Sequence, residues 1–166
     1  MTKRVYEPNA LISFVAGAPL VQPSSADSIP FTTRIITDVY SGVSLETAGI
    51  PAAFPGAYPG YVDIRDVARL VVFGVEHPEK ADNERFIAVS AAGSNQDVAD
   101  ILRKAYPERA SIIQEGKPGE GYLPDHSFPK TGAVYDGSKA ARVTGQAFIP
   151  WEQTVLDTVE SLKAVL

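Results

Sequence analysis

The apolar residues fall into short groups whose spacing alternates between strand-like and helix-like. The run from Ala10 to Val15 is continuous, holds β-branched and aromatic residues, and is too short for a buried helix, so it predicts a buried strand. Residues 84–90 have the same character and predict another strand. Residues 110–114 are expected to form a further strand that leads into a glycine-rich segment.

Helix-like spacing with start and stop signals marks four segments around these strands. Pro107 and Gly145 supply two of the stops, and Pro150 stands near the first turn of the last helix, where proline is tolerated. The expected helices are Phe31 to Tyr40 with Gly42 as its stop, a helix opened by Ser94 and Asp97, Ser138 to Thr144, and a final helix with Trp151, Val155, Val159 and Leu162 on one face.

The stretch from Tyr61 to Leu70 is the point around which the chain is organised. A strand end meets a helix start there, with Asp63 able to accept from free backbone N–H groups and Asp66 placed at the positive end of the helix dipole. His77 and Pro78 close this helix. Its expected apolar face consists of Ile64, Val67, Ala68, Val71 and Val75.

The alternation of strands and helices predicts an α/β fold built on one domain, residues 1–166. Only about three strands are recognisable, and a parallel sheet is normally covered on both faces by crossover helices. The chain therefore resembles part of a larger sheet. Residues 49–60 are rich in proline, glycine and alanine, which suits a lid beside a binding surface and a plain linker equally.

Charge and composition exclude several classes of partner. The chain has 15 basic and 20 acidic residues, a net charge of -5, so no attraction for nucleic acid or anionic lipid is expected. It lacks an apolar run long enough to span a membrane and a signal-peptide core, which favours a cytoplasmic protein. Cysteine is absent, and His77 and His126 are far apart, so we expect no metal site.

Two motifs match known patterns of chemistry only in part. Tyr135 and Lys139 have the Tyr-x-x-x-Lys spacing that places a tyrosine acid and a pKa-lowering lysine on one helical face, but Gly137 lies between them, which favours a loop tyrosine beside a helix start. Residues 116–121 carry the glycines of a phosphate-binding loop. Two prolines in the segment that follows prevent a helix there, so we interpret this loop as a plain turn.

The segment from Gly60 to Ala68 resembles a hallmark of the extended short-chain dehydrogenases/reductases, nearest to fungal ketone and aldehyde reductases and plant dihydroflavonol reductases. The chain's closing pattern is similar to that of the same family: Asp136, Ser138, Lys139, Ala140, Gly145, Phe148 and Pro150. Thr144 stands where the family commonly has leucine.

This resemblance implies an NADP-dependent oxidoreductase that reduces a small-molecule carbonyl substrate. Residues 10–166 would correspond to the C-terminal part of a Rossmann-type enzyme, from the late nucleotide-domain strand through the substrate-binding lobe, with a partial parallel sheet. The dinucleotide fingerprint and the catalytic Ser/Thr, Tyr and Lys lie upstream of the matching region in that family. We therefore expect no catalytic residue here, weak or no NADPH binding, and no activity from this chain alone; the oligomeric state stays open.

The same resemblance suggests where a cofactor would touch the chain. Pro19, Leu20 and Val21 resemble the proline-bearing turn that lines the nicotinamide, although Gln22 replaces the usual glycine, and Thr33 stands where a Ser or Thr contacts the cofactor. Loop packing and a mid-helix hydroxyl would explain these four residues without a cofactor. Two other functions also fit the residues: a sugar epimerase or dehydratase, and a non-catalytic binding module.

Overall fold

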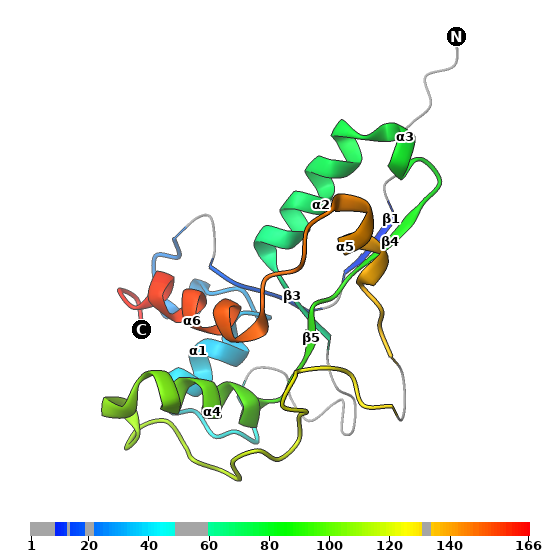
Figure 1. Ribbon diagram of the computed structural model, residues 1–166. Helices are drawn as coiled ribbons and strands as arrows, with labels where there is room; N and C mark the ends of the chain where they lie inside the picture. Colours follow the sequence, from blue (N-terminus) through cyan, green and yellow to red (C-terminus); the bar gives the residue numbers. More distant parts are fainter. Residues whose placement is uncertain (1–8, 13, 19–21, 49–59, 131–133) are drawn as a thin grey trace.

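The computed structural model describes residues 9–12, 14–18, 22–48, 60–130 and 134–166. Within these ranges the chain is a mixed α/β protein (Figure 1). No helix there is long and apolar enough to cross a membrane. The strands are β1 (Asn9–Ile12), β2 (Phe14–Ala16), β3 (Gly60–Asp63), β4 (Arg85–Ala88) and β5 (Ala91–Ala92). The helices are α1 (Arg34–Tyr40), α2 (Ile64–Glu76), α3 (Pro78–Ala81), α4 (Asn95–Ala105), α5 (Ser138–Thr144) and α6 (Trp151–Leu162), with short 3-10 turns η1 (Ala26–Ser28) and η2 (Pro107–Arg109).

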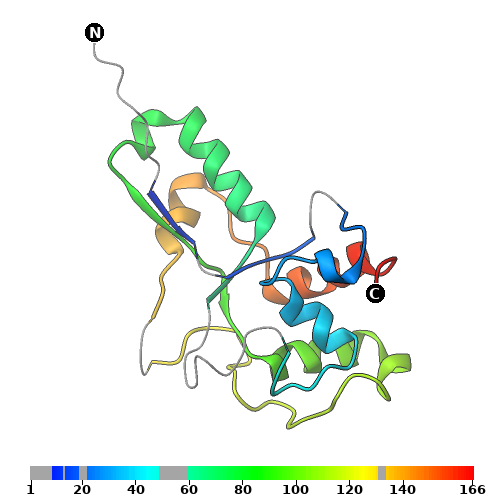
Figure 2. The ribbon, with the colours of Figure 1, turned by 180° about the vertical axis from the view of Figure 1, so that it is seen from behind.

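The strand predicted at residues 10–15 is present but divided into two, and each half has its own partner. β1 pairs in parallel with β4, whereas β2 pairs in parallel with β3, which is antiparallel to β5. Figures 1 and 2 show α2 and α5 beside the β1–β4 pair, and α1, α4 and α6 gathered at the opposite end. The predicted α/β class with a partial parallel sheet is thus confirmed.

β3 separates two hydrophobic cores. Tyr61 belongs to the core formed by α1, α4 and α6, and Val62 to the core formed with α2, β4 and α5. Both side chains are completely buried. Successive side chains of a strand point to opposite faces, so one short strand supports both cores.

The predicted helix ends are confirmed where a capping residue sets them. The Asp63 side chain accepts from Arg65 N–H at 2.9 Å at the start of α2, and Ser94 Oγ accepts from Asp97 N–H at 3.2 Å at the start of α4. α5 ends at Gly145, whose φ of +69° is favourable for glycine. Pro150 precedes the first residue of α6.

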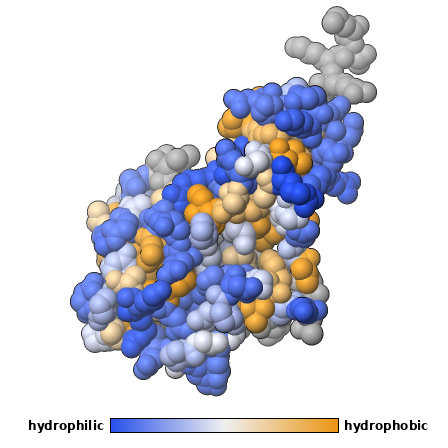
Figure 3. Space-filling view, viewed as in Figure 1, coloured by the Kyte–Doolittle hydropathy of each residue, from blue (hydrophilic) through white to orange (hydrophobic). Residues whose placement is uncertain are grey.

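The predicted apolar face of α2 is wrong in part. Its buried residues include Val67 and Leu70, but Val71 is 47% and Val75 is 68% exposed. The helix carries two apolar stripes, and only one of them is buried. Asp66 lies on the buried side and accepts from Ile149 N–H at 2.8 Å, which ties this side of the helix to the segment before α6. Ala68, Val71, Val72 and Val75 form the second stripe, called the exposed stripe below. Figure 3 shows hydrophobic surface at the end of the molecule where Figure 1 places α2.

The strand predicted at residues 110–114 is also wrong. The segment follows η2 as a turn, with Ile113 buried in the core. Arg103 Nη1 donates to the carbonyl oxygens of Ala110 and Ile113, both at 2.6 Å, so a side chain satisfies backbone groups that a strand partner would otherwise bind. α1 likewise begins at Arg34, later than predicted, because residues 30–33 form a turn.

Candidate functional site

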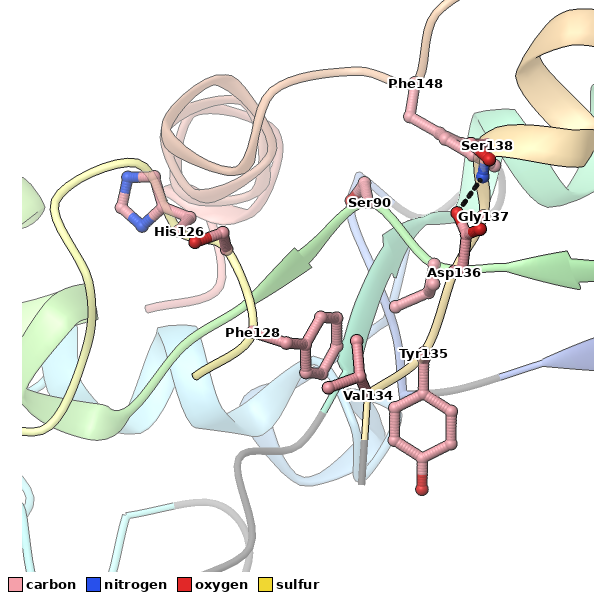
Figure 4. A pocket seen from close by; sticks show the side chains of 11 residues that line it. Ser90, His126, Phe128, Val134, Tyr135, Asp136, Gly137, Ser138 and Phe148 are labelled. Atoms are coloured by element: carbon pink, nitrogen blue, oxygen red, sulfur yellow. Dashed lines mark hydrogen bonds between the residues drawn. The ribbon is translucent and has the colours of Figure 1, made fainter. Parts of the chain in front are cut away.

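A cavity of about 430 Å³ opens beside the C-terminal end of β4 and the start of β5. This volume is in the range of small-molecule sites, about 300–1,000 Å³. Figure 4 shows the lining residues in four parts of the chain: the β4–β5 connection, residues 126–128, residues 134–138 and Phe148. The lining residues are Val89, Ser90, His126, Ser127, Phe128, Val134, Tyr135, Asp136, Gly137, Ser138 and Phe148.

Two aromatic rings form one wall of the cavity. Phe128 and Tyr135 meet edge to face, with ring centroids 5.5 Å apart and planes at 70°. Val134 lies beside Phe128, and Phe148 stands at the far end near Ser138 (Figure 4). Such a wall is suited to the hydrocarbon part of a ligand.

The polar groups of the lining are largely engaged with the protein. Ser90 donates to the Tyr61 carbonyl oxygen through both its N–H, at 2.8 Å, and its hydroxyl, at 3.1 Å. Asp136 accepts from Ser138 N–H at 2.8 Å. Hydrogen bonding to the backbone and side chain of Ser138 holds the pKa of the Asp136 carboxyl below its ordinary value. Among the described lining residues there is no lysine or arginine, so the cavity favours a neutral ligand over an anion.

Gly137 allows the lining to approach β4 closely. A Cβ atom at this position would lie 2.3 Å from the Val89 carbonyl oxygen and 2.9 Å from Phe148. Any other residue would push residues 134–138 away from the sheet. Glycine is therefore required here by space, since its backbone angles are ordinary helical ones.

A buried carboxylate supports the segment that carries Phe128. His126 Nδ1 lies 3.1 Å from Asp97 Oδ2, and Asp97 is fully buried in the first turn of α4. Burial raises the pKa of Asp97 to about 6, although His126 and the Trp151 indole act to lower it. Figure 4 shows the His126 imidazole directed away from Phe128, so His126 supports the wall from behind.

The Tyr135–Lys139 motif has a structural role in the protein. Tyr135 precedes α5, and Lys139 in the first turn of that helix pairs with Glu84 and lies 5.2 Å from the Phe86 ring centroid. Tyr135 and Lys139 therefore do not share a helical face.

The glycine-rich loop is a turn, as predicted. Lys117 N–H donates to Gln96 and Gly119 N–H donates to Asp100, both at 2.7 Å, so these loop amides bind side chains of α4. No helix follows the loop in the described residues up to 130.

Of the predicted cofactor contacts, Pro19, Leu20 and Val21 lie outside the described residues. Thr33 is buried before the first turn of α1, makes no capping hydrogen bond, and is not among the cavity-lining residues. The structure thus leaves all four as predictions. Sequence reasoning missed the cavity wall, whose only signal was the spacing of aromatic residues through an irregular, proline-containing segment.

Comparisons with known proteins identify fungal relatives. The chain is 32% identical over 108 residues to the NADPH-dependent methylglyoxal reductase of Saccharomyces cerevisiae, which covers 65% of this chain and 30% of the relative. It is 31% identical over 131 residues to the ketoreductase azaE of Aspergillus niger, covering 79% of this chain and 36% of the relative. The chain therefore spans about a third of the length of the curated relatives it matches. No family model matches it.

Solved structures share the fold over nearly the whole chain. Yeast methylglyoxal/isovaleraldehyde reductase Gre2 complexed with NADPH matches 93% of this chain and 42% of its own, with a TM-score of 0.73 and 24% identity. Gre2 from Candida albicans in complex with NADPH matches 94% of this chain and 43% of its own, with a TM-score of 0.69 and 25% identity.

Proposed function

Because the homologues of this chain are fungal methylglyoxal reductase and related oxidoreductases of the extended short-chain dehydrogenase/reductase type, we propose that it forms the substrate-side part of an NADPH-dependent carbonyl reductase. In this reaction a hydride passes from the reduced nicotinamide to the carbonyl carbon, and a proton is added to the carbonyl oxygen. The observation that carries the proposal is the largely apolar cavity beside β4 and β5. We also propose a cytoplasmic location.

The cavity residues would act by binding and by excluding water. Phe128 and Val134 would pack against the hydrocarbon part of the carbonyl compound, and removal of water strengthens the electrostatic interactions of the carbonyl group. We assign the proton donor to none of these residues, because Tyr135 and Lys139 are not on one helical face.

The exposed stripe of α2 suggests where a nucleotide-binding part would pack. Val71, Val72 and Val75 are 47%, 52% and 68% exposed and follow each other at helical spacing. A continuous apolar stripe of this kind is typical of a surface that another part of a protein covers. NADPH would then be held by that part, with Thr33 and residues 19–21 as contacts from this chain.

The test uses the complete protein that contains this chain, purified from cells. Its NADPH oxidation is measured with methylglyoxal, isovaleraldehyde and acetophenone as substrates. We expect turnover with at least one of them. Val134→Trp, which fills the cavity from a position 58% exposed, should raise KM about 10- to 100-fold. Val43→Trp, at another exposed valine that is neither on the exposed stripe nor among the cavity-lining residues, is the matched control and should leave the KM for the carbonyl compound unchanged.

Residues 1–166 on their own are the second arm of the experiment. We expect neither tight NADPH binding nor carbonyl reduction from them, since this part supplies cavity walls and few cofactor contacts. Micromolar NADPH binding with turnover that Tyr135→Phe abolishes would contradict this expectation and make Tyr135 the acid. If the protein as cells make it neither binds NADPH nor reduces any carbonyl compound, it is a non-catalytic binding module.

A further inference from the structure

We propose that Asp97 and His126 are positioning residues for the cavity. Their contact holds residues 126–128 so that Phe128 forms its part of the aromatic wall. This inference rests on the proposed function only in taking the cavity as the place where the carbonyl compound binds.

The backbone of His126 needs support to keep its conformation. Its φ is +54°, in the left-handed region that few residues other than glycine adopt without cost. The residue is held on both sides: Ala92 N–H of β5 donates to its carbonyl oxygen at 2.8 Å, and its Nδ1 contacts Asp97. A strained residue persists where the surroundings determine it in this way. Ser127 and Phe128 follow directly in the chain, so the position of the His126 backbone determines where the Phe128 ring lies in the aromatic wall.

Asp97 is a rigid anchor for this contact. Its side chain is fully buried, and its N–H donates to the cap Ser94. Gly93 packs on it so closely that a Cβ atom there would lie 2.9 Å from Asp97 Oδ2 and 3.2 Å from Trp151 Nε1. The Trp151 ring, which stacks on Tyr61, lies at the same place and helps to hold the Asp97 carboxylate in position beside His126.

The segment before His126 is fastened to α4 by a separate set of bonds. Gln96 donates to the Glu115 carbonyl oxygen at 2.8 Å, and Tyr122 Oη donates to Asp100 at 2.8 Å. The Tyr122 ring then stacks on His126, with centroids 6.0 Å apart and planes at 8°. The contact of His126 with Asp97 lies between residues 115–122, which are bonded to α4, and residues 126–128, which line the cavity.

The structure offers a substitution that separates positioning from folding. In His126→Gly the left-handed backbone becomes favourable, which offsets part of the cost of leaving Asp97 without this contact, so the protein should still fold. His126→Asn is the conservative variant, because asparagine tolerates this region and its amide can donate to Asp97. Asn83→Gly is the matched control: Asn83 has a φ of +58° and is not a cavity-lining residue.

The experiment makes three measurements on the complete protein that contains this chain. They are the affinity for acetophenone by ligand-observed NMR, the kinetics (KM and kcat) of its NADPH-dependent reduction, and the nuclear Overhauser contact between the Phe128 and Tyr135 rings. For His126→Gly we expect affinity to fall and KM to rise about 5- to 20-fold with kcat nearly unchanged, and the ring contact to weaken. His126→Asn should restore at least half of the affinity. Asn83→Gly should leave all three as in the wild type.

The outcomes distinguish this inference from the proposed function. If His126→Gly keeps wild-type affinity, KM and ring contact, the positioning role is wrong while the reductase proposal stands. If the wild-type protein does not oxidise NADPH, the reductase proposal is wrong, and acetophenone affinity decides on positioning. If acetophenone does not bind either, the ring contact decides: its loss in His126→Gly supports positioning, and its persistence overturns it.

Discussion

Thr154 Oγ1 of α6 donates a hydrogen bond of 2.9 Å to Asp63 Oδ2 at the start of α2, and both side chains are fully buried. Asp63 also accepts from the backbone and side chain of Arg65. Burial alone would raise the pKa of Asp63, but the bonds from Arg65 and Thr154 outweigh it and lower the pKa. The family-like segment 60–68 is thus a structural junction, which joins the β3–α2 corner to the last helix.

We expect Thr154→Val to destabilise the protein by about 1–3 kcal/mol, because an equal-sized side chain leaves one oxygen of a buried carboxylate with fewer donors. The free energy of unfolding is measured by urea denaturation, followed by circular dichroism. Thr47→Val is the control: Thr47 is exposed and its hydroxyl donates to the nearby Ser44 carbonyl oxygen, so a change within about 0.5 kcal/mol is expected. Equal effects of the two substitutions would show that the Asp63 junction adds no stability.

We expect Gly137→Ala to cost about 2–4 kcal/mol, because the new methyl group would lie 2.3 Å from the Val89 carbonyl oxygen. Gly119→Ala separates this spatial effect from backbone strain. Gly119 has a φ of +79° with nothing within 4 Å of a Cβ, so only conformational strain of about 1 kcal/mol is expected. Thermal unfolding of both variants checks the difference. A Gly137→Ala protein as stable as Gly119→Ala would mean that residues 134–138 do not press on β4.

Asp97 makes the stability of the folded protein decrease as the pH rises. Its pKa is raised to about 6, so the folded state binds a proton more tightly than the unfolded state, in which the pKa is near 3.8. The contribution of Asp97 to stability is therefore full below about pH 3.8 and declines as the pH rises toward about 6. Groups that act on it are His126, Trp151 and Asp100, with Tyr61 and Tyr122 nearby.

Asp97→Asn should remove this decline, because an amide does not titrate. We expect the difference in unfolding free energy between variant and wild type to shift by about 1–3 kcal/mol in favour of the variant between pH 4 and pH 7. Urea titrations at several pH values measure it. Asp125→Asn, at an exposed carboxylate next to His126, is the control and should show no such shift in that direction. Parallel pH curves for wild type and Asp97→Asn would contradict the assigned pKa.

The sequence predicts the features of this fold that are set by local chemistry. The starts of α2 and α4 follow from Asp63 and Ser94, and the end of α5 from Gly145, because a cap or a left-handed glycine acts within one turn. Residues 110–114 have the apolar character of a strand, but Arg103 from α4 binds their carbonyl oxygens, and no local pattern shows a partner from another element.

The sequence does not predict the cavity, because contacts between distant segments leave no local pattern. Its lining comes from four parts of the chain that are separated in the sequence. Two tertiary features bring them together: the close approach of Gly137 to β4 and the contact of His126 with Asp97. In the sequence, Gly137 indicates only an interruption of a helical face, because its neighbours across the sheet are not visible there. α2 has two apolar stripes, so periodicity identifies apolar residues there but not which stripe is buried. The partners of the buried side, such as the Ile149 N–H that binds Asp66, are distant in the sequence.

In residues 1–166 on their own, the exposed stripe of α2 lies on the surface and should promote self-association. The double substitution Val71→Lys and Val75→Lys should change the free energy of unfolding by no more than about 0.5 kcal/mol, because both side chains are largely exposed. It should reduce self-association, measured by sedimentation velocity, because an apolar stripe on a surface promotes contact between copies. Val67→Lys, on the buried face of the same helix, is the control and should unfold the protein, since it would place an unpaired charge in the core. If the double variant unfolds as readily as Val67→Lys, the two valines support the fold itself and the stripe is not a surface for further polypeptide. If it stays folded but associates as strongly as the wild type, the contact between copies lies elsewhere.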